Sequence, residues 1–393
     1  MHTILEFNLY HRLTGIVDRF LPALLTLIIC VTTVSCRSPI PNLFLLGAMK
    51  AGTSSLFSAL NKHSQICSGL MKETHFFHYD HEYQKGPLYY KSLFLDKRSK
   101  CTVGVNESTR VLKPGYYIID ASTVLQDIAE VAPRIKEFYG AESSSLKFIV
   151  LLREPTSRDF SAYRHHAFNA ASNYSARFPE YTAAFESFRN IDGFKTMSEM
   201  FSHNISVSGT DSEYGTVTFP NGDRNGSSQL AESCQVSRVQ AINFLYGGYA
   251  QQLLSFMQHF DRSQLLVLKA EEVFADSERS LLAVFRFLGI PRGGSRSTRS
   301  TYPHVNHRGQ ANSNTALQCL LQYIPKLDCW FRDALHQYYA QANRDLECVL
   351  ARTQSHSAEP LFEPFGDSYR RLSCVSDARA EFDSLRAKAK FCI

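Results

Sequence analysis

The sequence predicts an α/β fold in which a P-loop-like parallel sheet is flanked by helices. Two apolar segments carry this prediction. Leu43–Leu46 breaks off at a glycine-bounded turn, and an apolar pattern with helical spacing resumes at Leu56. Leu146–Leu152 is a β-rich run without an internal turn residue, which is typical of a strand buried on both faces.

The turn after the first run is expected to bind phosphate. Gly47 and Gly52 have the spacing of a G-x-x-x-x-G loop, whose backbone N–H groups can surround an oxyanion at the start of a helix. A nucleotide-triphosphate loop would continue with Lys-Ser/Thr after its second glycine. Here Thr53 follows Gly52, and the lysine, Lys50, lies inside the loop.

A second set of polar residues follows the second apolar run. Arg153 comes directly after the strand, Pro155 suits the first turn of a helix, and Ser161 lies about two turns further along. Open α/β sheets bind ligands at the carboxyl ends of their strands. Because a kinase or ATPase would place a magnesium-binding carboxylate where Arg153 stands, we expect no metal.

Together these segments resemble the donor-binding motifs of sulfotransferases that use 3′-phosphoadenosine 5′-phosphosulfate (PAPS). The glycine loop is similar to the family's 5′-phosphosulfate loop, and the Arg-Pro-Ser segment to its 3′-phosphate motif. The resemblance implies a single sulfotransferase domain that binds PAPS, with Lys50 also stabilising the transferring sulfuryl group. The donor-binding residues that it implies are Lys50, Ala51, Gly52, Thr53, Ser54, Ser55, Arg153 and Ser161.

Glu73-Thr-His75-Phe76-Phe77 resembles the catalytic segment of heparan-sulfate-type sulfotransferases. A sugar hydroxyl must lose its proton as it attacks sulfur, so we expect Glu73 to be the general base and His75 to orient or assist it. The two phenylalanines are expected to exclude water and so to raise the pKa of the base. In the alternative interpretation, Glu73 pairs with Lys72 at the surface and the phenylalanines are ordinary core residues.

The sequence also departs from this family. Heparan-type members carry an acid after Phe-Phe, where this chain has His78. Gly104–Thr109 matches the next family block only in part, and no catalytic lysine can be assigned there. Arg308, in Asn306-His-Arg-Gly, is a further donor-binding candidate because chondroitin-type enzymes have a similar Asn-x-Arg before their final helix.

Composition limits the choice of partners. A chain of 393 residues with 44% apolar content can bury one large core. The net charge of +5 suits an anionic donor and an anionic polysaccharide, whereas the absence of basic runs and zinc spacings gives no sign of nucleic-acid binding. Several cationic residues lie near the motifs in the sequence, and they line either a glycan-binding cleft or a solvated face. They are Lys72, Arg110, Arg164, His165 and His166.

The amino-terminal region predicts a membrane segment. Phe20–Cys36 is an uncharged stretch of 17 residues that follows basic residues at Arg12 and Arg19. We expect a signal-anchor, with residues 1–19 cytoplasmic and the catalytic domain in the Golgi lumen, as in type II carbohydrate sulfotransferases. A cleaved signal, and hence secretion, is the alternative.

Other features favour an oxidising lumen. The chain has ten cysteines and four Asn-x-Ser sequons, at Asn106, Asn173, Asn204 and Asn225. Cys319 and Cys329 flank a step that contains a proline, and heparan-type members carry a similar close pair, so we expect these two to be bonded. Metal-binding cysteines are disfavoured because the chain has no C-x-x-C.

The resemblance covers residues 42–350, which we take as the catalytic domain, with a Gly/Ser/Asn-rich surface insertion at 190–234 and a tail at 351–393. Between the motifs, Pro114–Tyr139 is expected to form loop and helices. The later elements expected are a helix at Val236–Phe260, a strand at Gln264–Lys269, and helices at Ser277–Leu288 and Trp330–Leu350.

The resulting hypothesis is PAPS-dependent sulfuryl transfer to a carbohydrate hydroxyl. The alternatives are a P-loop phosphotransferase, an inactive lectin-like binder with the same fold, and a sulfotransferase with a non-carbohydrate acceptor.

Overall fold

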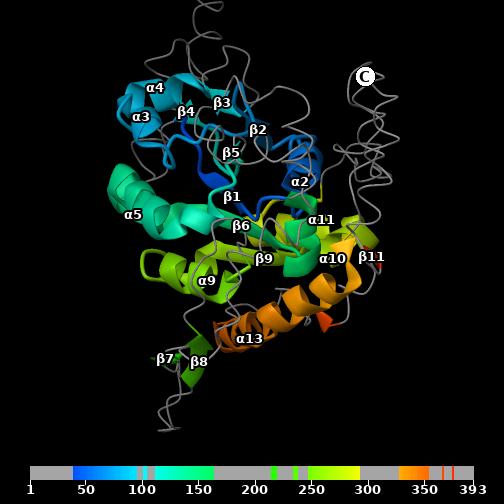
Figure 1. The fold of residues 1–393 in the computed structure, drawn as a ribbon. Coiled ribbons are helices and arrows are strands. Elements are labelled where there is room, and N and C mark those ends of the chain that lie inside the picture. The colour runs from blue at the N-terminus through cyan, green and yellow to red at the C-terminus, as the bar shows by residue number, and fades with distance from the viewer. Residues whose placement is uncertain are drawn as a thin grey trace, which may run out of the picture.

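A five-stranded sheet organises the molecule (Figure 1). The structure is a computed structural model that describes residues 39–94, 101–103, 111–162, 214–218, 233–237, 247–292, 327–353, 365–366 and 374–375. The strands are β1 (Leu43–Gly47), β2 (Ile66–Ser68), β5 (Tyr117–Asp120), β6 (Lys147–Leu152) and β9 (Leu265–Lys269). Their order is β2-β5-β1-β6-β9, and every pairing is parallel.

The central strands are buried on both faces, as a parallel sheet requires. All residues of β1 and β9 are buried, and β6 is buried after its first residue. The chain first adds β2 and β5 on one side of β1, and then β6 and β9 on the other side. The carboxyl end of β1 is therefore a topological switch point, where α/β sheets bind ligands. The predicted fold class is confirmed.

Helices cover the sheet. α2 (Thr53–Leu60) follows β1, α5 (Ile128–Tyr139) leads towards β6, and α10 (Ala270–Ala275) and α11 (Ser277–Leu288) follow β9. Figure 1 shows α5, α9 (Tyr249–Met257) and α13 (Cys329–Thr353) in a row, and α9 contacts both of the others. The predicted strand at Gln264–Lys269 and the two predicted carboxyl-terminal helices are confirmed to within a few residues.

Smaller elements complete the described part of the chain. They are α3 (Asp80–Tyr83), α4 (Gly86–Ser92), a β3–β4 pair (Thr102–Val103, Val111–Leu112), an antiparallel β7–β8 pair (Tyr214–Thr218, Ser233–Ser237), a β10–β11 pair (Leu327–Asp328, Cys374–Val375), and 3-10 turns at Leu125–Asp127, Gly140–Ser145 and Arg262–Gln264.

Two secondary-structure predictions were wrong. β5 lies where loop and helices were expected, because a four-residue strand between β1 and β2 is stabilised by its neighbours rather than by its own pattern. The helix expected from Val236 begins at Tyr249 in the described residues, and Val236 itself belongs to β8. Just before α9, Gly247 packs so closely on the Tyr339 ring of α13 that a Cβ would not fit.

Several predictions lie outside the described residues. These are the membrane segment at 20–36, the block at 104–109, the four sequons, Arg308 and Cys319. Most of the proposed insertion and tail also lie there. No helix in the described ranges has the length and apolar character needed to cross a membrane.

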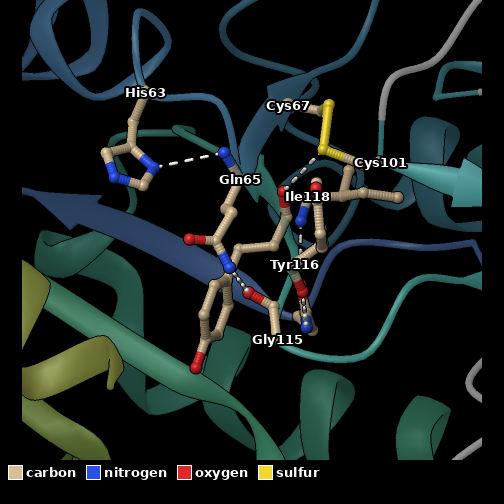
Figure 2. Close-up of a disulfide and its surroundings, with 9 residues drawn as sticks. His63, Gln65, Cys67, Cys101, Gly115, Tyr116 and Ile118 are labelled. Atoms are coloured by element: carbon tan, nitrogen blue, oxygen red, sulfur yellow. Dashed lines mark hydrogen bonds between the residues drawn. A yellow bond between two sulfur atoms is a disulfide. The ribbon is translucent and has the colours of Figure 1, made fainter. Parts of the chain in front are cut away.

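A disulfide that the sequence analysis did not predict joins Cys67 at β2 to Cys101 (Figure 2). Near it, the Gln65 amide donates to the Gly115 carbonyl at 3.0 Å, so the edge of the sheet is fastened at two points. Cys329 is also disulfide-bonded, but its predicted partner, Cys319, lies outside the described residues and the pairing stays a prediction.

We expect the Cys67→Ala/Cys101→Ala double variant to lose about 2–4 kcal/mol of unfolding free energy, because the bond closes a loop between residues 34 positions apart. Urea unfolding of the oxidised proteins measures this loss, and non-reducing mass analysis confirms that the other disulfides still form. A variant with the native urea midpoint would show that this bond does not stabilise the fold.

Candidate functional site

The loop between β1 and α2 has the conformation of an anion-binding turn. The Ala48 N–H donates to the Leu151 carbonyl at 2.7 Å, which fixes the start of the loop against β6. Gly52 has φ 100°, and a Cβ there would come within 2.6 Å of the Phe274 ring, so glycine is required. The Gly52 carbonyl accepts the N–H groups of Ser55 at 3.1 Å and Leu56 at 3.2 Å, so α2 begins directly after the loop and its positive dipole end lies at this end of the sheet.

Two predicted catalytic residues have strained backbones. Lys50 has φ 67° and His75 has φ 51°, and in the described part of the chain these are the non-glycine residues with positive φ. An L-residue in the left-handed region costs on the order of 1 kcal/mol or more and persists only where its surroundings hold it. Such strain is concentrated at functional sites, which supports the choice of these two positions.

Arg153 joins the two donor motifs. Its Nη1 donates to the Lys50 carbonyl at 3.1 Å, across 103 residues of sequence. Tyr249 in turn donates to the Arg153 carbonyl at 2.9 Å. The structure therefore brings the glycine loop and Arg153 together at the carboxyl ends of β1 and β6.

The electrostatics of this junction favour an anion. Burial, and then the nearby charge of Arg153, lower the pKa of Lys50 to about 8, although the Glu73 carboxylate acts in the opposite direction. Burial likewise lowers the pKa of Arg153, against the opposing charge of Glu271. Two desolvated cations side by side form a site that a polyanion would stabilise.

The helix after Arg153 begins as the sequence predicts. Residues 155–162 are helical, and the buried Glu154 carboxylate accepts hydrogen bonds from the N–H groups of Thr156 (2.9 Å) and Ser157 (2.7 Å). This carboxylate therefore plays the part of a helix cap. Ser161 lies on the same helix and is half-buried.

Further along this helix, a buried acid connects it to α13. Tyr339 donates to Asp159, which also pairs with Arg158, and all three side chains are fully buried. Burial raises the pKa of Asp159 to about 6, against the opposing charge of Arg158.

Glu73 is close enough to Lys50 for its charge to raise the pKa of the lysine. The Glu73 carboxylate has three hydrogen-bond or ion-pair partners. They are Lys72 Nζ, His75 Nε2 at 3.2 Å and Thr123 Oγ1 at 3.2 Å. The pairing with Lys72 is the one foreseen in the alternative interpretation, but the Glu73 side chain is only 31% exposed.

The expected rise in the pKa of Glu73 is wrong. Burial does act to raise it, but the hydrogen bond from His75 and the charge of Lys72 outweigh burial and lower the pKa to about 2. The carboxylate is therefore ionised and can accept a proton, although it is a weak base in this arrangement.

The two phenylalanines belong to the core, as the alternative interpretation held. Phe76 and Phe77 are buried, and Phe76 stacks on Tyr90 with 4.4 Å between ring centroids. Their observed contribution is to anchor the segment that carries Glu73.

A polar scaffold at the end of β5 positions this segment, and sequence reasoning missed it. Asp120 accepts from Thr74 Oγ1 at 2.7 Å, from Tyr90 at 2.9 Å and from Ser122 Oγ at 2.6 Å. Ser122 Oγ then accepts the N–H groups of Thr74 and His75, both at 2.9 Å. The signal was an acid that ends the apolar run Tyr-Ile-Ile-Asp, and it becomes visible once β5 is recognised as a strand.

The remaining predicted residues are unequally described. Ala51, Thr53, Ser54 and Ser55 lie in the loop and first turn of α2. Among the cleft cations, Lys72 binds Glu73, and the others, Arg110, Arg164, His165 and His166, lie outside the described residues, as does Arg308. Within the described ranges, no group of three or more side chains is arranged to hold a metal ion.

Comparison with known families identifies this arrangement. The family model described as "Sulfotransferase domain" matches residues 41–307. The chain belongs to the sulfotransferase domain family. The match includes both donor motifs, the Glu73 segment and the sheet that positions them.

The chain is also similar to individual proteins. Heparan sulfate glucosamine 3-O-sulfotransferase 5 of Mus musculus and that of Homo sapiens are each 30% identical over 125 residues, which is 32% of this chain and 30% of the relative. The match thus spans less than a third of these relatives.

Among solved structures, a sulfotransferase from Alicyclobacillus acidocaldarius covers 81% of this chain and 98% of its own at 19% identity and TM-score 0.44. The sulfotransferase domain from the curacin biosynthetic pathway covers 90% and 98% at 11% identity and TM-score 0.37.

Because the pKa of Lys50 is about 8, its ammonium is charged below that pH and neutral above it. We expect the affinity for adenosine 3′,5′-bisphosphate, a probe of the predicted donor site, to fall up to about tenfold per pH unit above pH 8, levelling off at the higher pKa of the bound state. Isothermal titration calorimetry between pH 7 and pH 10 (roughly the range of lysine titration) measures this. In Lys50→Arg the side chain stays charged, so bisphosphate affinity should not change with pH over this range. A pH-independent affinity of the native protein would show that the charge of Lys50 does not contribute to binding of this ligand.

Proposed function

We propose that this chain transfers the sulfuryl group of PAPS to a hydroxyl group of a carbohydrate. The observation that carries the proposal is the junction of buried Lys50 and Arg153 at the carboxyl ends of β1 and β6, with the ionised Glu73 beside it. Burying two neighbouring cations is costly unless an anion offsets their charge. A base beside the anion site is the arrangement that transfer to a hydroxyl needs.

The residues present fit the donor. The glycine loop, the start of α2 and Lys50 offer N–H groups and a cation to the 5′-phosphosulfate. Arg153 and the half-buried Ser161 would bind the 3′-phosphate by resemblance to the family. When bound, PAPS supplies an activated sulfuryl group on a good leaving group. Membership of the sulfotransferase domain family supports this choice of donor.

The chain's own residues supply acid–base and electrostatic catalysis. Glu73 accepts the proton of the attacking hydroxyl, and Lys50 stabilises charge on the departing phosphate oxygen. Lys72 affects the base strength of Glu73, because its charge is one cause of the low pKa of that carboxylate. An anionic acceptor that draws Lys72 away would make Glu73 a stronger base at the moment of transfer.

A glycosaminoglycan-like polysaccharide is the proposed acceptor. The match to the heparan sulfate sulfotransferases of mouse and human, which includes no more than a third of either chain, supports it. We further propose a Golgi membrane protein anchored through residues 20–36, with secretion after signal cleavage as the alternative. The Cys67–Cys101 disulfide supports a domain that folds in an oxidising compartment.

Two measurements test the function. Calorimetry should detect binding of adenosine 3′,5′-bisphosphate but not of ATP with magnesium. Labelled PAPS should then transfer its label to one of a panel of desulfated heparan, chondroitin and algal-type polysaccharides. Tight ATP binding without bisphosphate binding would favour a phosphotransferase. Bisphosphate binding without any transfer would favour the inactive binder, and label on phenols or tyrosine peptides alone would exclude a carbohydrate acceptor.

Two groups of variants should separate donor binding from proton removal. Arg153→Ala and Ser161→Ala should each weaken bisphosphate binding by roughly 1.5–3 kcal/mol, the usual contribution of a hydrogen bond to a charged group.

Glu73→Gln should keep bisphosphate affinity but lose about 10²–10⁴-fold in turnover. Glu82→Gln, at a carboxylate that binds Lys85 instead, is the matched control and should behave as native. Normal turnover of Glu73→Gln would assign the base to another residue, His75 first.

A further inference from the structure

A continuous path of close contacts leads from Glu73 to a second carboxylate. His75 Nε2 lies 3.2 Å from Glu73 Oε2, and His75 Nδ1 lies 3.4 Å from His78 Nδ1. His78 Nε2 then lies 2.9 Å from Asp127 Oδ2. Each imidazole directs one nitrogen towards Glu73 and the other towards Asp127.

The backbone holds the two rings in this order. His75, with its positive φ, donates its N–H to Ser122 Oγ, and His78 N–H donates to the His75 carbonyl at 3.0 Å. Arg134 of α5 donates to the carbonyls of Phe77 and His78, at 3.2 and 3.0 Å. Three residues apart in one turn, the imidazoles lie on the same side of the segment.

The charged and titratable groups around the rings come from several elements. Lys72 and Glu73 precede them, and Tyr79, stacked on His78 with 4.3 Å between centroids, follows. From α5 and its start come Arg134, which is paired with Asp80, and Asp127. Lys50 acts on Glu73 from the phosphate loop.

Asp127 does not cap α5 with its side chain, although its position would allow it to. It is the N-cap residue of α5, where an aspartate normally accepts a hydrogen bond from the first turn and adds about 1 kcal/mol of stability. The Asp127 side chain makes no such bond and instead lies on His78. It is 39% exposed, compared with 19% for His78, so the path ends at solvent.

Counting protons shows what the path can carry. With both carboxylates ionised, each end needs an N–H donor, and the contact between the two rings needs one more proton. Filling all three contacts at once takes three protons on four nitrogens, one more than the two that a pair of neutral imidazoles carries. The path therefore has a place for one added proton between Glu73 and Asp127.

We propose that His78 and Asp127 are positioning residues that lead the acceptor's proton from Glu73, through His75, to solvent at the start of α5. As the acceptor oxygen bonds to sulfur, its O–H bond breaks and Glu73 gains the proton. The relay starts from neutral imidazoles with the His75 proton on Nδ1 and the His78 proton on Nε2, so that His75 Nε2 is an acceptor. Glu73 passes its proton to His75 Nε2, the His75 Nδ1 proton moves to His78 Nδ1, and the His78 Nε2 proton moves to Asp127 and then to water. Each imidazole gains one proton and loses one, so charge and atoms balance.

The relay rests on the proposed function and deepens it. Bound donor and acceptor together would cover the Glu73 carboxylate. A route that takes the proton away through His75, on the side away from the substrates, is therefore useful during transfer.

The activity test uses Asp127→Asn and His78→Gln in the full chain. Asparagine is as good an N-cap as aspartate, so α5 should form normally. We expect turnover to fall about tenfold in dilute buffer, with bisphosphate affinity unchanged, and to recover as imidazole buffer is added. Asp80→Asn, which alters a neighbouring carboxylate outside the path, is the matched control and should show no buffer dependence. A loss of turnover that added buffer does not restore would indicate a structural role and overturn the relay.

A second readout does not need activity. Histidine ¹⁵N NMR of the full chain should show a changed His75 signal in Asp127→Asn, although Asp127 pairs with His78 and not with His75, and no change in Asp80→Asn. An unchanged His75 signal would overturn the relay. If native protein transfers sulfuryl groups while Asp127→Asn is indistinguishable from it, only the relay fails. If native protein transfers to no acceptor, the proposed function fails, and the relay fails with it.

Discussion

Because β1 lies between β5 and β6 and the three strands run parallel, the residues that follow them must meet at one edge of the sheet. β1 leads into the glycine loop, β6 leads to Arg153, and β5 leads to Asp120 and Ser122. The site is thus assembled by strand order, and no single segment contains it. Breaking the β1–β6 pairing would separate Lys50 from Arg153 even if each local motif kept its shape.

The second organising influence is charge. Lys50, Arg153 and Lys72 lie together, and Glu73 is the carboxylate that acts on Lys50. The pKa values of Lys50 and Glu73 are both lowered, but by different causes. Burial is the largest cause for Lys50, whereas for Glu73 burial acts in the opposite direction and is outweighed by the hydrogen bond from His75 and the charge of Lys72. A bound polyanion would change all of them at once. In the proposed function, donor binding and the base strength of Glu73 would therefore be coupled.

Sequence alone could predict those parts that depend on local pattern. The glycine loop, the strand before Arg153 and the helix at Ser277–Leu288 each have a signal within about ten residues, and each is found where expected. β5, the Asp120 scaffold and the Cys67–Cys101 bond depend on which strands become neighbours, and no local pattern states that. The pKa of Glu73 was predicted in the wrong direction because its aromatic neighbours are visible in sequence, whereas the hydrogen bond from His75 depends on a left-handed turn.

The contact between Tyr339 and Asp159 has a consequence for where the autonomous folding unit ends. The family match stops at residue 307, yet α13 supplies the hydroxyl that satisfies the buried Asp159, and its Tyr339 ring packs against Gly247. A fragment cut at the family boundary would leave Arg158 and Asp159 in an exposed cavity beneath the helix that carries Ser161. We therefore expect the smallest fragment that keeps this helix and the proposed donor site intact to include α13, which ends at Thr353.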